Sequence, residues 1–211
     1  FVWLKGGERV VDLGTGVGII PLILGTWGTD VEQIVGVELQ EELAALARRN
    51  VRDNGLEDLV AIYQGDIKGL RDAFAPASFD VVVTNPPYYR VPSGRINPRS
   101  QKAVARHEIA GTIDDIVQAA RYLLAERGRI FVVYPAQRSV ALLNRLTGAA
   151  LEPKRIRWVH SREGEGAKFI LTEAHKGGGE GVEVLPPLYV YSASGDYTGE
   201  MESLYSIPLQ S

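Results

Sequence analysis

The chain has 211 residues, a formal net charge of −3, 45% apolar residues and 23% charged residues, which suits one globular α/β domain. The absence of cysteine excludes disulfides, thiolate metal ligands and cysteine nucleophiles, and the three histidines are too scattered in the sequence to predict a metal site. No stretch approaches the roughly 18 apolar residues of a membrane span and no signal peptide is visible, so we expect a cytoplasmic, metal-free protein.

Strands and helices are predicted to alternate between residues 8 and 148. The stretch 40–55 shows the helical pattern clearly, because its apolar residues recur every three to four positions and Gly55 ends it. The stretch 79–85 is nearly all apolar, as expected for a central parallel strand that is covered on both faces. The other predicted strands are 8–14, 33–39, 59–66 and 129–135, and the other predicted helices are 18–27 and 112–128. This alternation predicts a doubly wound, mostly parallel, Rossmann-like sheet.

The pattern changes after Gly148. Residues 153–161 and 168–176 are predicted to form an antiparallel hairpin at the edge of the sheet, which brings the sheet to about seven strands. Residues 177–179 are three glycines and are expected to form a flexible loop. Residues 184–206 are expected to form a final extended segment and a short helix.

The first predicted strand runs into the sequence DLGTGVG, which contains Asp12, Gly14, Gly16 and Gly18. Glycines at a strand-to-helix turn allow close backbone approach to a ligand, and the helix N-terminus offers free N–H groups. The spacing is G-x-G-x-G, whereas the nicotinamide-nucleotide fingerprint is G-x-G-x-x-G. A carboxylate two positions before the first glycine suits a cationic amine better than a pyrophosphate.

Two further acids follow the next two strands. Glu38 ends the second strand, where an acid can accept hydrogen bonds from both hydroxyls of a ribose. Asp66 ends the third strand and could accept from an adenine amine, although a helix cap or a turn is the alternative role for it. These acids predict a ligand with an amine, a ribose and an adenine but no phosphate, which describes S-adenosylmethionine. The other residues predicted to contact it are Thr15, Leu39, Ile67 and Asn85.

The sequences VVDLGTGVGIIPL, VGVEL, QGDI and FDVVVTNPPYY, in this order and spacing, resemble the motifs of class I S-adenosylmethionine-dependent methyltransferases. The resemblance covers nearly the whole chain and implies a single domain of that class over residues 1–211. Because the chain begins close to its first strand, we expect an N-terminal segment to be missing.

The motif Asn85-Pro86-Pro87-Tyr88 follows the fourth strand, beside the predicted methyl donor. A planar amine gains positive charge as it is methylated, and the Asn85 side-chain oxygen and the Pro86 carbonyl can accept hydrogen bonds from it. The two prolines restrict the backbone, and the Tyr88 ring can stack on a planar target. The alternative for this motif alone is a rigid turn without chemistry. After the predicted cofactor residues, we interpret it as an amino-methyltransferase site.

The next stretch is rich in positive charge. Five cations and no acid lie between the motif and Glu108, and they are Arg90, Arg95, Arg99, Lys102 and Arg106. Such a cluster beside a base pocket suits a phosphate backbone, whereas a solvated loop is the alternative. Arg106, His107 and Glu108 are also candidates for positioning the substrate, with a salt-bridged helix start as an equal alternative.

The segments NPPYY, ARHE, LEPKRIRWVH, ILTEAHKGG and PLYVYSASGDYTGE resemble the bacterial tRNA1(Val) adenine-N6 methyltransferases. This resemblance implies an RNA partner, with the adenosine at position 37 of that tRNA as the target. Enzymes that methylate glutamine in release factors share the Asn-Pro-Pro-Tyr motif, as do adenine methyltransferases of rRNA and DNA. A cofactor-binding scaffold without activity is a further alternative. The sequence leaves the oligomeric state open.

Overall fold

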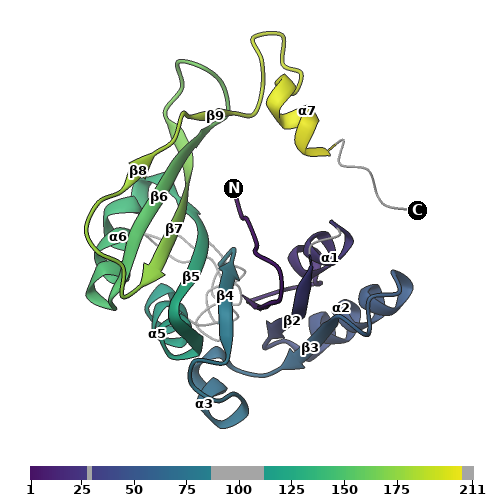
Figure 1. The fold of residues 1–211 in the computed structure, drawn as a ribbon. Coiled ribbons are helices and arrows are strands. Elements are labelled where there is room, and N and C mark those ends of the chain that lie inside the picture. The colour runs from purple at the N-terminus through teal and green to yellow at the C-terminus, as the bar shows by residue number, and fades with distance from the viewer. Residues whose placement is uncertain (28–29, 87–111, 206–211) are drawn as a thin grey trace, which may run out of the picture.

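The computed structural model describes residues 1–27, 30–86 and 112–205. Its centre is one nine-stranded sheet with the order β3-β2-β1-β4-β5-β7-β6-β8, in which β9 also pairs with β6 (Figure 1). The five neighbouring strands β3, β2, β1, β4 and β5 run parallel to one another. β7 runs antiparallel to both β5 and β6. The bounds are β1 Glu8–Leu13, β2 Val31–Glu38, β3 Val60–Gln64, β4 Phe79–Thr84, β5 Leu124–Pro135, β6 Leu151–His160, β7 Ala167–Lys176, β8 Glu183–Val184 and β9 Leu188–Tyr189.

The predicted doubly wound, mostly parallel sheet is therefore confirmed, with nine strands instead of about seven. The predicted hairpin is present as β6 and β7, and β8 and β9 add to the outer side of β6. The expected short helix near the C-terminus is α7, Gly199–Tyr205. Among the helices of the described ranges, none is long and apolar enough to cross a membrane.

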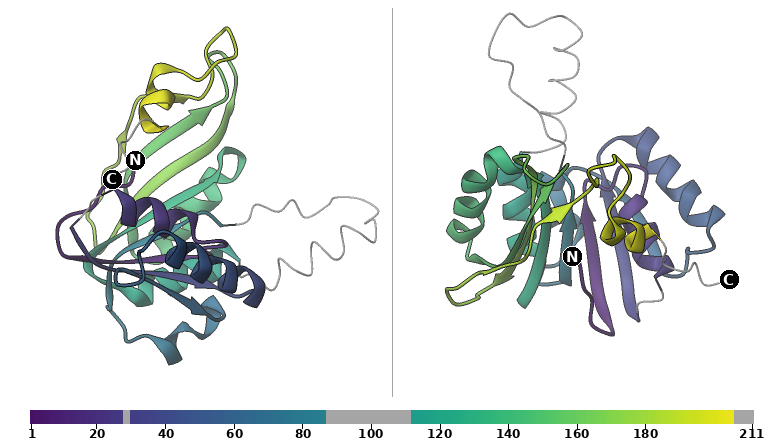
Figure 2. Two further views of the ribbon diagram at one scale, coloured as in Figure 1. Left: turned by 90° about the vertical axis from the view of Figure 1, so that its right-hand side faces the viewer. Right: turned by 90° about the horizontal axis from the view of Figure 1, so that it is seen from above.

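Helices cover both faces of the sheet, as Figure 2 shows from above. Alternate strand residues face opposite sides, because side chains alternate along a strand. Val10, Val81 and Val83 pack on the side of α1 and α2, whereas Val11 and Val82 pack on the side of α3, α5 and α6. The helices are α1 Ile19–Thr26, α2 Glu41–Asp53, α3 Leu70–Ala73, α5 Ile113–Leu123 and α6 Ser139–Gly148, with short 3₁₀ turns η1 Ile67–Gly69 and η2 Ala136–Arg138.

One predicted boundary is wrong. The helix expected over 112–128 ends at Leu123, and β5 already begins at Leu124. The fully buried Leu124 pairs with Phe79, and the register then shifts so that Val81 pairs with Arg129. This irregularity places extra residues in β5, with Arg127 at a φ of 62°. Tertiary pairing with β4 thus overrides the helical preference of the intervening residues.

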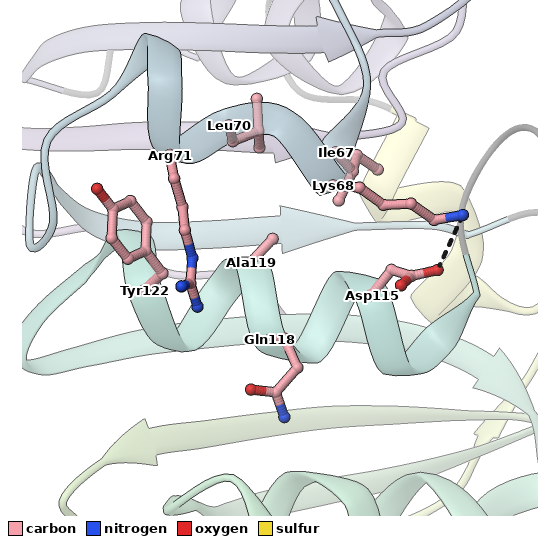
Figure 3. Close-up of a pocket in the computed structure, with 8 residues that line it drawn as sticks. All are labelled: Ile67, Lys68, Leu70, Arg71, Asp115, Gln118, Ala119 and Tyr122. Carbon is pink, nitrogen blue, oxygen red and sulfur yellow. Dashed lines mark ion pairs between the residues drawn. The ribbon is translucent and has the colours of Figure 1, made fainter.

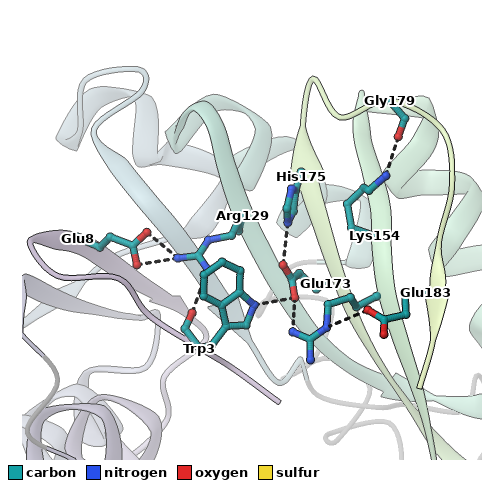
Figure 4. A network of polar contacts seen from close by, with 9 residues as sticks. Trp3, Glu8, Arg129, Lys154, Glu173, His175, Gly179 and Glu183 are labelled. Atoms are coloured by element: carbon teal, nitrogen blue, oxygen red, sulfur yellow. Dashed lines mark hydrogen bonds and ion pairs between the residues drawn. The ribbon is translucent and has the colours of Figure 1, made fainter. Parts of the chain in front are cut away.

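A network of polar contacts lies at the amino end of β1 and extends to β5, β7 and β6 (Figure 4). Glu8 at the start of β1 accepts two hydrogen bonds of 2.6 Å from the Arg129 guanidinium of β5. The guanidinium also lies 3.8 Å from the centre of the Trp3 ring and donates to the Trp3 carbonyl. The Trp3 indole N–H donates to Glu173 of β7, which also accepts from Arg155 of β6. The network joins the N-terminal segment to four strands.

Candidate active site

The turn after β1 is held against the end of β2. The backbone N–H groups of Gly14 and Thr15 both donate to the Val37 carbonyl, at 3.0 and 2.9 Å. Gly14 and Gly16 have φ angles of 81° and 58°, which side chains other than glycine rarely adopt. A Cβ atom at either position would meet nothing within 4 Å, so the turn borders open space. The predicted glycine turn therefore leaves room for a ligand.

Gly18 differs from the other two glycines. It has a φ of 85° and precedes the first residue of α1. A Cβ atom there would lie 3.3 Å from the Cβ atom of Ala47 in α2. Gly18 therefore allows close packing of two helices, while its predicted contact with the cofactor stays a prediction.

Asp12 lies one residue before the end of β1 and is 1% exposed. Its neighbours across the sheet are Gly36 of β2 and Val83 of β4. Neither carboxylate oxygen has a hydrogen-bond partner within the described part of the chain, and the same holds for the buried Thr15 hydroxyl. Burial raises the pKa of Asp12 to about 7. The nearby Thr15 side chain lowers this pKa, whereas the Glu38 carboxylate raises it further. An unsatisfied buried carboxyl group at a strand end marks a place where a donor is missing.

Glu38 ends β2 and is 6% exposed, but its carboxylate is satisfied. One oxygen accepts from the Gly16 backbone N–H and the other from the Gln40 backbone N–H, both at 2.9 Å. Each oxygen retains a second lone pair, so Glu38 can still accept from hydroxyl groups of a ligand. The half-buried Leu39 follows, and its carbonyl accepts from the Gln64 side chain at 3.2 Å. The Gly16 and Gln40 contacts were not apparent from the sequence, because they depend on backbone direction.

Asp66 performs the capping role that the sequence left open for it. Its side chain accepts from the Lys68 backbone N–H at 2.9 Å and so caps η1. The carboxylate is exposed, and the following Ile67 is 7% exposed and packs in the core. The cap and a contact with an adenine amine are compatible, because a carboxylate has several acceptor positions.

Asn85 and Pro86 follow directly on β4, which lies beside β1 in the sheet. The Thr84 hydroxyl, which sequence reasoning overlooked, donates to the Leu13 carbonyl at 2.8 Å and ties the ends of these two strands together. Asn85 is exposed and Pro86 is buried. The structure thus brings the Asn-Pro segment to the edge where Asp12 and the glycine turn lie.

The remaining predicted residues lie outside the described ranges. They are Pro87, Tyr88, Arg90, Arg95, Arg99, Lys102, Arg106, His107 and Glu108. Their roles stay predictions. Within the described ranges, no group of three or more His, Asp or Glu side chains could hold a metal ion.

A polar hollow of about 290 Å³ lies between η1, α3 and α5 (Figure 3). Lys68 and Asp115 form an ion pair of 3.8 Å at one end, and Arg71 lies over the Tyr122 ring at the other. Neither Asp12 nor Glu38 lines this hollow. It is therefore separate from the glycine turn. The ion pair fixes η1 against the first turn of α5.

Residues 4–152 match the family described as the methyltransferase small domain. The chain belongs to this family. As a member, it is a methyltransferase whose methyl donor is S-adenosylmethionine. The match includes β1 to β5 and therefore every strand end described above.

Two curated relatives and two solved structures illustrate the likeness. The tRNA1(Val) (adenine(37)-N6)-methyltransferase of Actinobacillus pleuropneumoniae serotype 5b is 27% identical over 95% of this chain and 82% of its own length. The protein of the same name from Proteus mirabilis is 33% identical over 61% of this chain and 50% of its own length.

A predicted O-methyltransferase from Agrobacterium tumefaciens has a TM-score of 0.75 at 20% identity, over 95% of this chain and 89% of that one. A methyltransferase structure from Aquifex aeolicus has a TM-score of 0.59 at 14% identity, over 82% of this chain and 85% of that one. At these identities the structures establish the fold alone.

The residues present fit the cofactor of this methyltransferase family. S-adenosylmethionine carries an ammonium group, and the buried Asp12 carboxyl has no partner in the described part of the chain. Its nucleoside carries hydroxyl groups, and the Glu38 carboxylate is fixed with acceptor capacity remaining. The open space over Gly14 and Gly16 lies at the same edge. Ligands of open α/β sheets bind at the carboxyl ends of the strands, where these residues lie.

Proposed function

We propose that the chain transfers the methyl group of S-adenosylmethionine to the exocyclic N6 atom of an adenine in RNA, namely adenosine 37 of tRNA1(Val), in the cytoplasm. The observation that carries the proposal is the likeness over 95% of the chain to a relative with that name. The Asn85-Pro86 segment beside Asp12 supports it, because this segment suits methylation of an amine.

The cofactor supplies an electrophilic methyl group on a positively charged sulfur. Asp12 would hold its ammonium group, Glu38 its ribose hydroxyls and Asp66 its adenine amine, in the order of their strands. The backbone N–H groups of Gly16 and Gln40 hold the Glu38 carboxylate in place before the ligand binds. A preorganised acceptor of this kind lowers the entropy that is lost on binding.

The target amine is a weak nucleophile, because its lone pair is delocalised into the adenine ring. The Asn85 side-chain oxygen and the Pro86 carbonyl would accept hydrogen bonds from its two hydrogens. These bonds strengthen as the nitrogen gains positive charge, so they favour the transition state over the ground state. The Thr84 hydroxyl, bonded to the Leu13 carbonyl, supports both acceptors by holding the end of β4 against β1. Tyr88 would stack on the target base.

The cations between Arg90 and Arg106 would contact phosphate groups of the RNA. A base in a tRNA loop is easier to extrude than one in a duplex, which favours a loop target. Affinity for tRNA should therefore fall with added salt. Neutralising one cation should flatten the log–log slope by about 0.7 to 0.9.

The test is transfer of labelled methyl from S-adenosylmethionine to tRNA, rRNA, DNA and release-factor protein in parallel, followed by nucleoside analysis. N6-methyladenosine in tRNA1(Val), and none in a transcript with guanosine at position 37, is the expected result. Label in the release factor with tRNA blank would replace the proposal with glutamine methylation. An absence of label in all four, with the cofactor bound, would make the chain a scaffold.

A further inference from the structure

Two carboxyl groups from adjacent strands converge at the carboxyl edge of the sheet. Asp12 of β1 pairs with Gly36, which lies two residues before Glu38 on β2. Both acids are nearly buried, with exposed fractions of 1% and 6%. Neither forms an ion pair with a lysine, arginine or histidine in the described ranges.

The two acids nevertheless differ in their partners. Glu38 accepts one backbone hydrogen bond on each oxygen. Asp12 has no hydrogen bond on either oxygen within the described part of the chain, although the nearby Thr15 hydroxyl favours its charged form. Burial and the neighbouring Glu38 carboxylate both favour the protonated form of Asp12, so we expect the unpartnered Asp12 to hold a proton in the ligand-free protein.

Among the described residues, the group that opposes protonation of Asp12 is the Thr15 hydroxyl, which carries no charge. Glu38 is the charged side chain that faces it from β2, and the Thr15 hydroxyl faces it from the turn after β1. Its β4 partner, Val83, is apolar. The pKa of Asp12, which burial raises to about 7, agrees with a proton held in the ligand-free protein near neutral pH.

We propose that the cofactor binds by proton exchange, in which its ammonium group replaces the proton that Asp12 holds in the ligand-free protein. The Asp12 carboxyl loses one proton to solvent, the ammonium keeps all of its own, and no covalent bond to carbon changes. Asp12 thereby selects ligands with the amino-acid moiety, and more strongly as the pH rises. This inference rests on the proposed cofactor and on Asp12 as its ammonium acceptor.

The size of the effect follows from the titration of one group. With a pKa of about 7, Asp12 is about 90% protonated at pH 6 and about 10% protonated at pH 8. Binding of S-adenosylhomocysteine should therefore release about 0.9 proton at pH 6 and about 0.1 at pH 8, and its affinity should be about tenfold weaker at pH 6. 5′-Methylthioadenosine has the nucleoside but lacks the ammonium group, so it should release none.

The test is isothermal titration calorimetry of the chain with S-adenosylhomocysteine at pH 6 and pH 8, in phosphate and in imidazole, which both take up protons at these pH values. These buffers differ in ionisation enthalpy, so the difference in apparent binding enthalpy counts the released protons. 5′-Methylthioadenosine is the matched control ligand, and Asp12→Asn is the matched variant. The variant should bind S-adenosylhomocysteine more weakly, with no proton release and with equal affinity at both pH values.

Equal apparent enthalpies in both buffers at pH 6 would overturn the proton exchange and leave the cofactor assignment standing. Equal proton release with 5′-methylthioadenosine would also overturn it, because the proton would then come from elsewhere. A failure of S-adenosylhomocysteine to bind at either pH would instead overturn the proposed function, and this inference with it. The wild-type measurements decide the matter even if the variant does not fold.

Discussion

Replacing Glu8 by glutamine should destabilise the protein strongly, although the two side chains have nearly the same shape. The Arg129 and Glu8 side chains are 3% and 11% exposed, so the ion pair between them is almost removed from water. The variant leaves the Arg129 guanidinium buried without its counter-charge. Removing one partner of a buried ion pair costs about 3–5 kcal/mol. The Trp3 ring and carbonyl still contact the guanidinium, so we expect a value near the lower limit, about 3 kcal/mol.

The assay is equilibrium unfolding in urea, with thermal unfolding as a second probe. For a chain of 211 residues, about 3 kcal/mol corresponds to a fall in Tm of roughly 6–12 °C. A matched control is Asp53→Asn, which breaks the ion pair between Asp53 and Arg49. The side chains of Arg49 and Asp53 are 70% and 60% exposed. Exposed pairs on a helix contribute about 0.3–0.5 kcal/mol, so this control should leave unfolding almost unchanged.

A double variant separates the ion pair from the shape of the site. Glu8→Gln combined with Arg129→Met removes both charges, and a buried pair can often be replaced by apolar residues at little cost. We therefore expect the double variant to regain most of the stability that the single variant loses. A loss below about 1 kcal/mol for Glu8→Gln alone would show that solvent reaches Arg129, and would refute the reasoning.

Three further outcomes are expected at the other end of the sheet. Glu38→Ala should weaken S-adenosylhomocysteine binding in calorimetry by about 1–3 kcal/mol, because the ribose hydroxyl groups of the ligand lose their acceptor. An unchanged affinity would contradict the ribose-binding role of Glu38. Asn85→Ala should lower turnover in the methyl-transfer assay by a factor of about 10²–10³, with cofactor affinity nearly unchanged. If the variant kept half of the wild-type activity, the Asn-Pro-Pro-Tyr motif would have a structural role and not a catalytic one.

Asp12→Asn should stabilise the ligand-free protein, because the folded state holds a proton up to a pKa of about 7 and the unfolded state loses it near 3.8. The gain in urea unfolding should grow from about 2 kcal/mol at pH 5 to about 4 kcal/mol at pH 8, and a pH-independent difference would contradict it.

Much of this fold is encoded in local sequence patterns. The apolar run 79–85 predicts β4, and the glycines after Asp12 predict the turn between β1 and α1, because such patterns depend on neighbouring residues only. The end of α5 could not be located in this way. Leu124 is followed by residues of good helical propensity, yet its pairing with Phe79 ends the helix, and that contact joins distant parts of the chain.

The difference between Asp12 and Glu38 was equally hidden. Both are acids near the ends of apolar strands, and the sequence predicts a ligand contact for each. Their hydrogen bonds differ because the backbone N–H groups of Gly16 and Gln40 point towards Glu38, and backbone direction leaves no trace in residue identity. Asp66 shows the opposite case, since its sequence position already indicated the cap that the structure contains.

The strand β1 carries an acid near each end, and their partners differ in origin. Glu8 finds its donors within the chain, in Arg129 and in the Lys5 backbone N–H at 2.6 Å, so its contribution is to stability. Asp12, four residues later, finds none in the described part of the chain, so its charge would be stabilised by a bound ammonium group. Substitution at Glu8 should therefore lower the free energy of unfolding and leave cofactor affinity unchanged. Substitution at Asp12 should raise the free energy of unfolding of the ligand-free protein and lower the affinity for the cofactor. If the Glu8 and Asp12 variants instead changed the free energy of unfolding equally and the cofactor affinity equally, the two ends of the strand would not be independent.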